Sequence, residues 1–156
     1  MSHIHYKLDY TIEVYIVHKD KVLLRKHDKY GIWLSVGGHI EPGEDPIEAA
    51  LREVKEEVGL EVEIVTPIEL LETDGERYQH LPPPAFMNRH RIVHEHEHLA
   101  LIYFAETTQA SITQSEQEKS EKCQWFTRKE IEDLQQNISS TVKNYAIAAL
   151  AFLNPQ

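Results

Sequence analysis

A strongly punctuated helix signal between Asp45 and Gly59 constrains the fold of this chain more than any other feature. Asp45 is a preferred N-cap residue, Pro46 suits the first helical position, and Glu48 completes the spacing of a capping box. Gly59 suits the left-handed conformation that ends many helices. The sequence therefore predicts a helix over residues 46–58 with both ends fixed.

This helix has two faces of different chemistry when its residues are placed at about 100° per residue. One arc is apolar and predicts a side that packs on the core. Its members are Ile47, Ala50, Leu51, Val54 and Val58. Glu53, Glu56 and Glu57 occupy a second arc, where i,i+3 and i,i+4 spacing brings three carboxylates together.

The carboxylates stand where local electrostatics disfavour them. Like charges at these spacings repel, and the C-terminal half of a helix disfavours anions. An acidic helix face is in general an ordinary solvated surface, but the neighbours here favour a site. Arg52 lies one turn from Glu56 and can bridge to it, which would orient that carboxylate as a ligand. Glu44 precedes the helix, and Gly37 and Gly38 allow a ligand to approach the backbone. A hard dication such as Mg²⁺ or Mn²⁺ would relieve the repulsion, because it prefers oxygen ligands.

Strands surround the helix on both sides. Alternation of apolar and polar residues over 10–17 and the run at 22–25 predict a hairpin with a polar turn. Further strand segments are predicted at 32–36, 60–65, 68–72 and 94–106. Two more helices are predicted by their caps, one from Thr127 to about Gln136 and one from Ser139 or Ser140 through Leu153. Mixed strands with helices before and after predict an α/β sandwich.

Composition limits the class of protein. A chain of 156 residues with 41% hydrophobic residues is most simply one domain, 1–156. The formal charge of −10 argues against bare electrostatic binding to nucleic acid polymers or membranes, so a phosphate substrate would need a cation. One cysteine, Cys123, suits a reducing compartment. The N-terminus lacks the apolar stretch of a signal peptide, and we expect a cytoplasmic protein.

The segment from Gly38 to Leu60 resembles the Nudix box. Five residues separate Gly38 from Glu44, and seven more lead to the run REVKEEVGL that begins at Arg52. Val36 stands where the family commonly has proline before the two glycines. The resemblance implies a Nudix-type α/β/α sandwich with a mixed sheet. It also implies a hydrolase that uses Mg²⁺ or Mn²⁺ to cleave nucleoside diphosphates linked to another moiety.

The same resemblance implies roles for individual residues. Glu53, Glu56 and Glu57 would be metal ligands and catalytic residues, with the Gly37 carbonyl as a possible backbone ligand. Glu44 would be an auxiliary ligand or support, and Arg52 would orient the carboxylates. The general base is left open: it is Glu53 or Glu57 within the box, or a loop carboxylate before Trp125, for which the candidates are Glu116 and Glu118.

Several residues outside the box are candidates for substrate binding. Arg25, at the end of the second strand, is a phosphate ligand or an ordinary solvated strand end. An irregular stretch at 73–92 carries Tyr78, Phe86 and Arg89, which could stack on a nucleobase or hold phosphate or ribose. Phe86 could equally pack this loop onto the body of the domain.

Histidines gather late in the sequence, at His90, His94, His96 and His98. On a strand, the last three would share one face. We weigh three interpretations, namely a polar strand end near the substrate pocket, an inert surface and a zinc site, and favour the first because the spacing matches no usual zinc motif.

Taken together, the residues favour a metal-dependent hydrolase of a small-molecule phosphoanhydride, and they are compatible with a homodimer. Two alternatives are a hydrolase of a non-nucleotide diphosphate and a non-catalytic domain that senses a nucleotide-like ligand.

Overall fold

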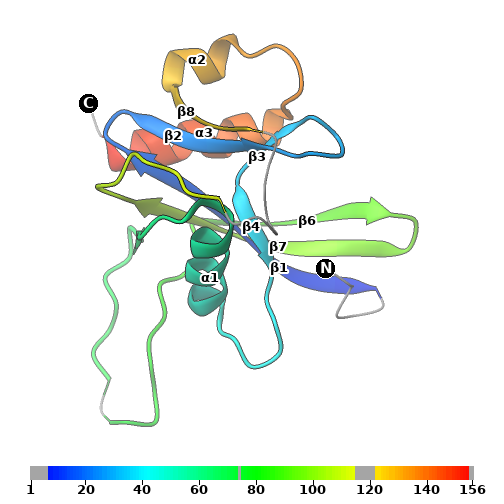
Figure 1. The fold of residues 1–156 in the computed structure, drawn as a ribbon. Helices are drawn as coiled ribbons and strands as arrows, with labels where there is room; N and C mark the ends of the chain where they lie inside the picture. The colour runs from blue at the N-terminus through cyan, green and yellow to red at the C-terminus, as the bar shows by residue number, and fades with distance from the viewer. Residues whose placement is uncertain (1–6, 74, 115–121, 155–156) are drawn as a thin grey trace.

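A mixed β-sheet lies between helices in the computed structural model of the protein, which describes residues 7–73, 75–114 and 122–154. Helix α1 (Pro46–Val58) covers one face of the sheet, and α2 (Arg128–Asp133) and α3 (Ser140–Leu153) cover the other (Figure 1). The α/β/α sandwich expected from the sequence is therefore confirmed. None of the helices in the described part of the chain is long and apolar enough to cross a membrane.

The centre of the sheet is a parallel pair formed by β1 (Leu8–His18) and β7 (His96–Glu106). The remaining strands are β2 (Lys21–Lys26), β3 (Trp33–Leu34), β4 (Val36–His39), β5 (Glu63–Val65), β6 (Phe86–Val93) and β8 (Lys122–Thr127). The main order is β3-β2-β1-β7-β5, while β4 also pairs with β1, β6 with β7 and β8 with β2. The predicted hairpin is β1–β2.

Alternation along β1 supplies both hydrophobic cores. Tyr15 and Val17 pack on the side of α2 and α3, whereas Val14 and Ile16 pack on the side of α1. All four are buried. The sheet is therefore covered on both faces, and the position of α1 is fixed by the packing of its inner side against β1 and β4.

The ends of α1 are those predicted. Asp45 accepts hydrogen bonds from two backbone N–H groups of the first turn, and the Glu48 carboxylate accepts from the Asp45 N–H, which completes the capping box. One residue of the predicted apolar face is wrong: Leu51 is 43% exposed, while Ala49 is buried. The buried arc of the helix is displaced toward the acidic residues, so that Glu53 and Glu57 replace Leu51 on the inner side.

Other boundaries differ from the prediction. Helix α2 ends at Asp133 rather than near Gln136, because the backbone of Leu134 is extended. Strand β6 occupies most of the second half of the stretch predicted as irregular, and residues 68–72 form no strand. Strand β7 begins at His96 rather than at residue 94, because the chain turns at Glu95 in a left-handed conformation with φ 67°.

The C-terminal end of α1 can be tested by a substitution at Gly59. It has φ +69°, and a Cβ there would lie 2.5 Å from the Thr113 carbonyl oxygen. We expect Gly59→Ala to lower the free energy of unfolding by about 2 kcal/mol, because left-handed strain and a backbone clash add. Chemical denaturation measures the change. Gly75→Ala is the control, since nothing lies within 4 Å of its Cβ position, and equal effects in the two variants would contradict the prediction.

Candidate active site

Helix α1 presents two buried carboxylates to the neighbouring strands. Glu53 and Glu57 are only 5% and 4% exposed, whereas the side chain of Glu56 is 49% exposed. All three are ion-paired with arginines: Glu53 and Glu56 with Arg52, and Glu57 with Arg25. The helix therefore places the three predicted ligands on its strand-facing side and its edge.

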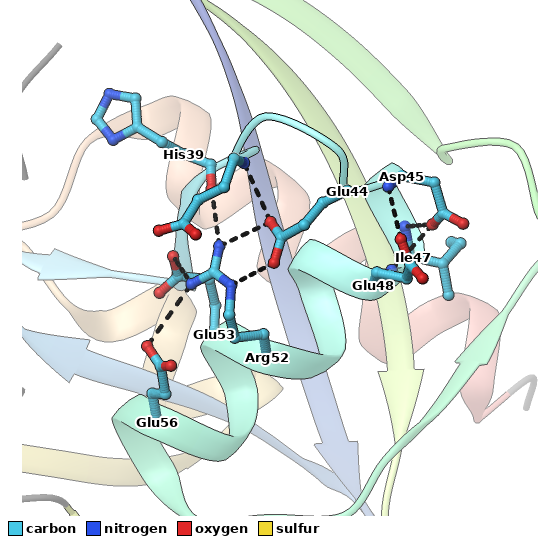
Figure 2. A network of polar contacts seen from close by, with 9 residues as sticks. His39, Glu44, Asp45, Ile47, Glu48, Arg52, Glu53 and Glu56 are labelled. Carbon is cyan, nitrogen blue, oxygen red and sulfur yellow. Dashed lines mark hydrogen bonds and ion pairs between the residues drawn. The ribbon is translucent and has the colours of Figure 1, made fainter. Parts of the chain in front are cut away.

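Arg52 lies at the centre of a polar network between α1 and the loop before it (Figure 2). Its Nε and Nη2 donate to the two carboxylate oxygens of Glu44 at 2.6 and 3.0 Å, and its Nη1 donates to Glu53 Oε1 at 2.8 Å. Nη2 also donates to the His39 carbonyl at 3.0 Å, while Glu56 is farther away at 3.6 Å. Arg52 is thus positioned to orient Glu53 more than Glu56.

This network also sets the charge state of its members. Hydrogen bonds from Arg52 lower the pKa of the Glu44 carboxyl below its ordinary value. Hydrogen bonding to Glu44, followed by the hydrogen bond to Glu53 and the charge of its carboxylate, raises the pKa of the Arg52 guanidinium. The carboxylate of Glu44 and the guanidinium of Arg52 are therefore both charged at neutral pH.

Glu57 is held from two sides. Arg25 Nη2 lies 2.8 Å from its Oε1, and the Gly37 N–H donates to its Oε2 at 3.0 Å. Arg25 reaches the site from the end of β2, so it is not an ordinary solvated strand end. Gly37 lies beside Glu57 as expected, but it contacts Glu57 through its backbone N–H and not through its carbonyl.

The two glycines of β4 leave the room that this arrangement needs. A Cβ on Gly37 would lie 2.1 Å from the Ile12 carbonyl oxygen, and a Cβ on Gly38 would lie 2.2 Å from Glu53 Oε1. Strand β4 can therefore approach both β1 and the Glu53 carboxylate only because these positions lack side chains.

Gly38→Ala tests this close approach. The added methyl group meets the flexible end of Glu53, so we expect the carboxylate to move while the fold is kept. Steady-state kinetics should show at least a ~10-fold lower kcat, the size of effect typical of displaced supporting groups at metal sites. The melting temperature should change little. An unchanged kcat would show that the position of Glu53 is not critical.

The predicted substrate-binding residues outside the box have different surroundings. Phe86 packs against Phe104 and Tyr145, with ring centroids at 6.1 and 5.4 Å, as expected for an anchor. Arg89 pairs with Glu97 across the β6–β7 hairpin, and Tyr78 is exposed. The structure brings none of these into the network of Arg52. Glu116 and Glu118 lie outside the described residues.

Two polar groups were missed in the sequence. Glu13 lies on β1, and its carboxylate accepts hydrogen bonds from Tyr15 and Ser35 at 3.2 and 3.3 Å. Burial, the main cause, raises the pKa of Glu13. In the sequence, Glu13 is visible only as a charged residue in a predicted strand of alternating apolar and polar residues. The second group contains Asp9 and His39, whose ion-pair atoms lie 3.2 Å apart.

The predicted histidine face is wrong in one position. His94 lies in the turn between β6 and β7, not on a strand with His96 and His98. The partners of these two histidines come instead from distant parts of the sequence, Asp9 on β1 and His39 on β4.

A family model described as "NUDIX domain" matches residues 9–145. The chain belongs to the Nudix family. Among solved structures, a Nudix-family hydrolase from Clostridium perfringens is 33% identical, with a TM-score of 0.85 over 94% of this chain and 98% of that one. A MutT protein from Methanosarcina mazei, 15% identical with a TM-score of 0.71 over 98% and 99% of the two chains, shares the fold.

Curated relatives of this Nudix chain include enzymes of known activity. It is 33% identical over 95 residues to the CTP pyrophosphohydrolase of Escherichia coli, covering 56% of this chain and 70% of that protein. It is 44% identical over 48 residues to the asymmetrical bis(5'-nucleosyl)-tetraphosphatase of Mus musculus, covering 31% and 33%. The chain thus spans about a third of the length of this mouse relative.

The Nudix box of this chain fits a divalent metal. The donors are carboxylate oxygens, the ligands that hard cations prefer. Two of them, Glu53 and Glu57, are buried and oriented by Arg52 and by the Gly37 N–H. The absence of a Cβ on Gly38 lets the Glu53 carboxylate lie directly against β4. The donor set therefore suits Mg²⁺ or Mn²⁺ better than a soft metal.

Proposed function

We propose that this Nudix protein hydrolyses a pyrophosphate linkage in a nucleotide or a nucleoside-diphosphate derivative, using Mg²⁺ or Mn²⁺. The observation that supports this most is the burial of Glu53 and Glu57 against the two-glycine strand, each held by an arginine. Burying carboxylates in this way is costly for stability alone. A reducing cytoplasm is the compartment that the single Cys123 favours.

The proposed roles divide between binding and orientation. Glu53, Glu56 and Glu57 would hold the metal, with the Gly37 carbonyl as a further oxygen ligand. Arg52 orients Glu53 and is itself braced by Glu44. A bound metal would neutralise phosphate charge and lower the pKa of an attacking water.

The proton of the attacking water needs an acceptor. Glu53 and Glu57 are candidates within the box, and Glu116 and Glu118 are candidates that precede β8 in the sequence. Arg25 is a counter-ion of Glu57 at 2.8 Å. We propose that it turns to a substrate phosphate when a metal takes over Glu57, since a guanidinium can bind phosphate oxygens with two parallel hydrogen bonds.

The class of substrate follows from the relatives. The printed names of two of them, a CTP pyrophosphohydrolase and a bis(5'-nucleosyl)-tetraphosphatase, specify nucleotide phosphoanhydrides. We propose the same class for this chain, with Tyr78 and Arg89 as residues that contact the substrate beyond its phosphates, while Phe86 anchors its strand on Phe104 and Tyr145. Each protomer carries the whole box, so a homodimer would not be needed for the chemistry.

A substrate panel tests this function. Nucleoside triphosphates, dinucleoside polyphosphates, ADP-ribose, sugar nucleotides and a non-nucleotide diphosphate would be incubated with the protein and Mg²⁺, and released phosphate or pyrophosphate measured. We expect turnover of at least one nucleotide, loss of activity with EDTA, and recovery with Mg²⁺ or Mn²⁺. Nucleotide binding without turnover would favour a sensor, and activity that survives chelation would contradict the metal requirement.

A further inference from the structure

A second cluster of ligand-type side chains lies where three strands meet, and none of its members is a carboxylate of the box. Asp9 is near the start of β1, His96 and His98 are at the start of β7, and His39 is the last residue of β4. Register brings them together, because Asp9 is paired with His98 and Thr11 with His39. Four residues from three distant segments thus share one end of the sheet.

The ligand atoms of the cluster are already close to one another. The oxygen and nitrogen atoms of Asp9, His39 and His98 that would bind a metal lie within 4.8 Å of each other. Asp9 Oδ2 is 3.2 Å from His39 Nε2 and 3.3 Å from His96 Nε2. The ring centroids of His39 and His96 lie 5.0 and 5.4 Å from that of His98. His98 is therefore flanked by both histidines that contact Asp9.

These separations suit a tetrahedral metal. Nitrogen and oxygen atoms bound about 2.0–2.2 Å from Zn²⁺ in a tetrahedron lie about 3.3–3.6 Å from each other. The two contacts of Asp9, with His39 and with His96, are close to that value. The 4.8 Å limit applies to Asp9, His39 and His98, and binding of one metal by all four residues requires side-chain rotations that bring His96 and His98 closer together around it.

Burial also suits a metal. The Asp9 side chain has no exposed surface and His96 is only 5% exposed. The buried carboxylate of Asp9 therefore lies where its negative charge needs a positive counter-charge, which a metal ion would supply.

We propose that Asp9, His39, His96 and His98 form a second metal site, with a donor set suited to Zn²⁺. Three imidazoles and one carboxylate are typical of borderline transition-metal ions, whereas Mg²⁺ prefers oxygen alone. This site is separate in chemistry from the Nudix box, which offers only oxygen donors.

The metal would have a positioning role, because His39 links the two sites. The His39 side chain faces Asp9, while its carbonyl accepts a hydrogen bond from Arg52 Nη2 at 3.0 Å (Figure 2). A metal bound by the His39 imidazole would hold the end of β4 in place. It would thereby also hold the His39 carbonyl, which accepts a hydrogen bond from Arg52 while Arg52 orients Glu53.

The test is direct metal binding rather than activity. The full-length protein would be stripped with a chelator, returned to excess Mg²⁺ to occupy the box, and titrated with Co²⁺ and with Zn²⁺. We expect one equivalent of Co²⁺ to bind and to give the visible absorption of tetrahedral cobalt, which Zn²⁺ then displaces. His98→Ala and His39→Gln should each weaken binding at least ~10-fold.

Matched variants separate this site from others. His94→Ala changes a nearby histidine in the turn, and Glu53→Gln changes the box; both should keep the cobalt spectrum. A variant with both His3 and His5 replaced by alanine should also keep it, since neither residue is one of the four proposed ligands. Full binding by folded His98→Ala and His39→Gln would overturn the proposal, and so would loss of the spectrum in Glu53→Gln or in the His3/His5 variant.

Discussion

Replacing Glu53 by glutamine is expected to lower kcat by at least ~10²-fold while the protein stays folded. The substitution keeps the size of a side chain that is only 5% exposed, but it removes the charge that Arg52 orients at 2.8 Å. Changes in groups that merely support a metal ligand cost 10–100-fold, so the loss of a ligand charge should exceed that range. The measurement is kcat with saturating Mg²⁺, alongside a thermal unfolding curve.

Glu63→Gln is the matched control, since it makes the same chemical change on an exposed position of β5. It should retain nearly full activity. Equal kcat values for the wild type and Glu53→Gln, at saturating Mg²⁺, would rule out the proposed catalytic role of the box. A loss that appears only together with a lower melting temperature would point to a structural role instead.

Replacing Arg25 by glutamine is expected to lower the free energy of unfolding of the metal-free protein by about 3 kcal/mol. The change leaves Glu57, which is 4% exposed, without the guanidinium that lies 2.8 Å away, and removal of one partner from a buried ion pair is strongly destabilising. Mg²⁺ should restore part of the loss, because a dication bound to Glu57 replaces the missing positive charge. Urea denaturation with and without Mg²⁺ measures both effects.

Arg128→Gln provides the comparison for Arg25. Arg128 pairs with Glu132 on α2, where both side chains are about half exposed, so its removal should cost at most about 0.5 kcal/mol. Equal losses in the two variants would contradict the buried-pair argument. If Mg²⁺ stabilises Arg25→Gln no more than it stabilises the wild type, this would count against Glu57 as a metal ligand.

The box and its helix could be predicted because their signals are local. The cap at Asp45, the end at Gly59 and the spacing of Glu53, Glu56 and Glu57 depend on residues within one or two helical turns. Hydrogen bonding to Arg52 was also foreseeable as an orienting contact. That Glu44 and Glu53, rather than Glu56, are its main partners depends on the loop before α1, which the spacing alone does not describe.

The features that could not be predicted depend on contacts between residues far apart in the sequence. Asp9 and His39 join the histidines of β7 only because β1 pairs with both β4 and β7. Leu51 was predicted to lie in the core because the buried face of the helix was inferred from hydrophobicity alone. In the structure, α1 instead turns Glu53 and Glu57 inward, and both are buried. Strand β6 was not predicted because its middle residues are polar and show no apolar alternation, and it forms by pairing with β7.

The parallel pairing of β1 with β7 has a consequence for the order of folding. Paired residues such as Thr11 and Ala100 are roughly 90 positions apart, so the centre of the sheet closes a long loop, which is slow relative to local structure. The β1–β2 hairpin, β4 and α1 lie within the first 58 residues. During synthesis on a ribosome, the box would therefore emerge well before the strand that completes its scaffold.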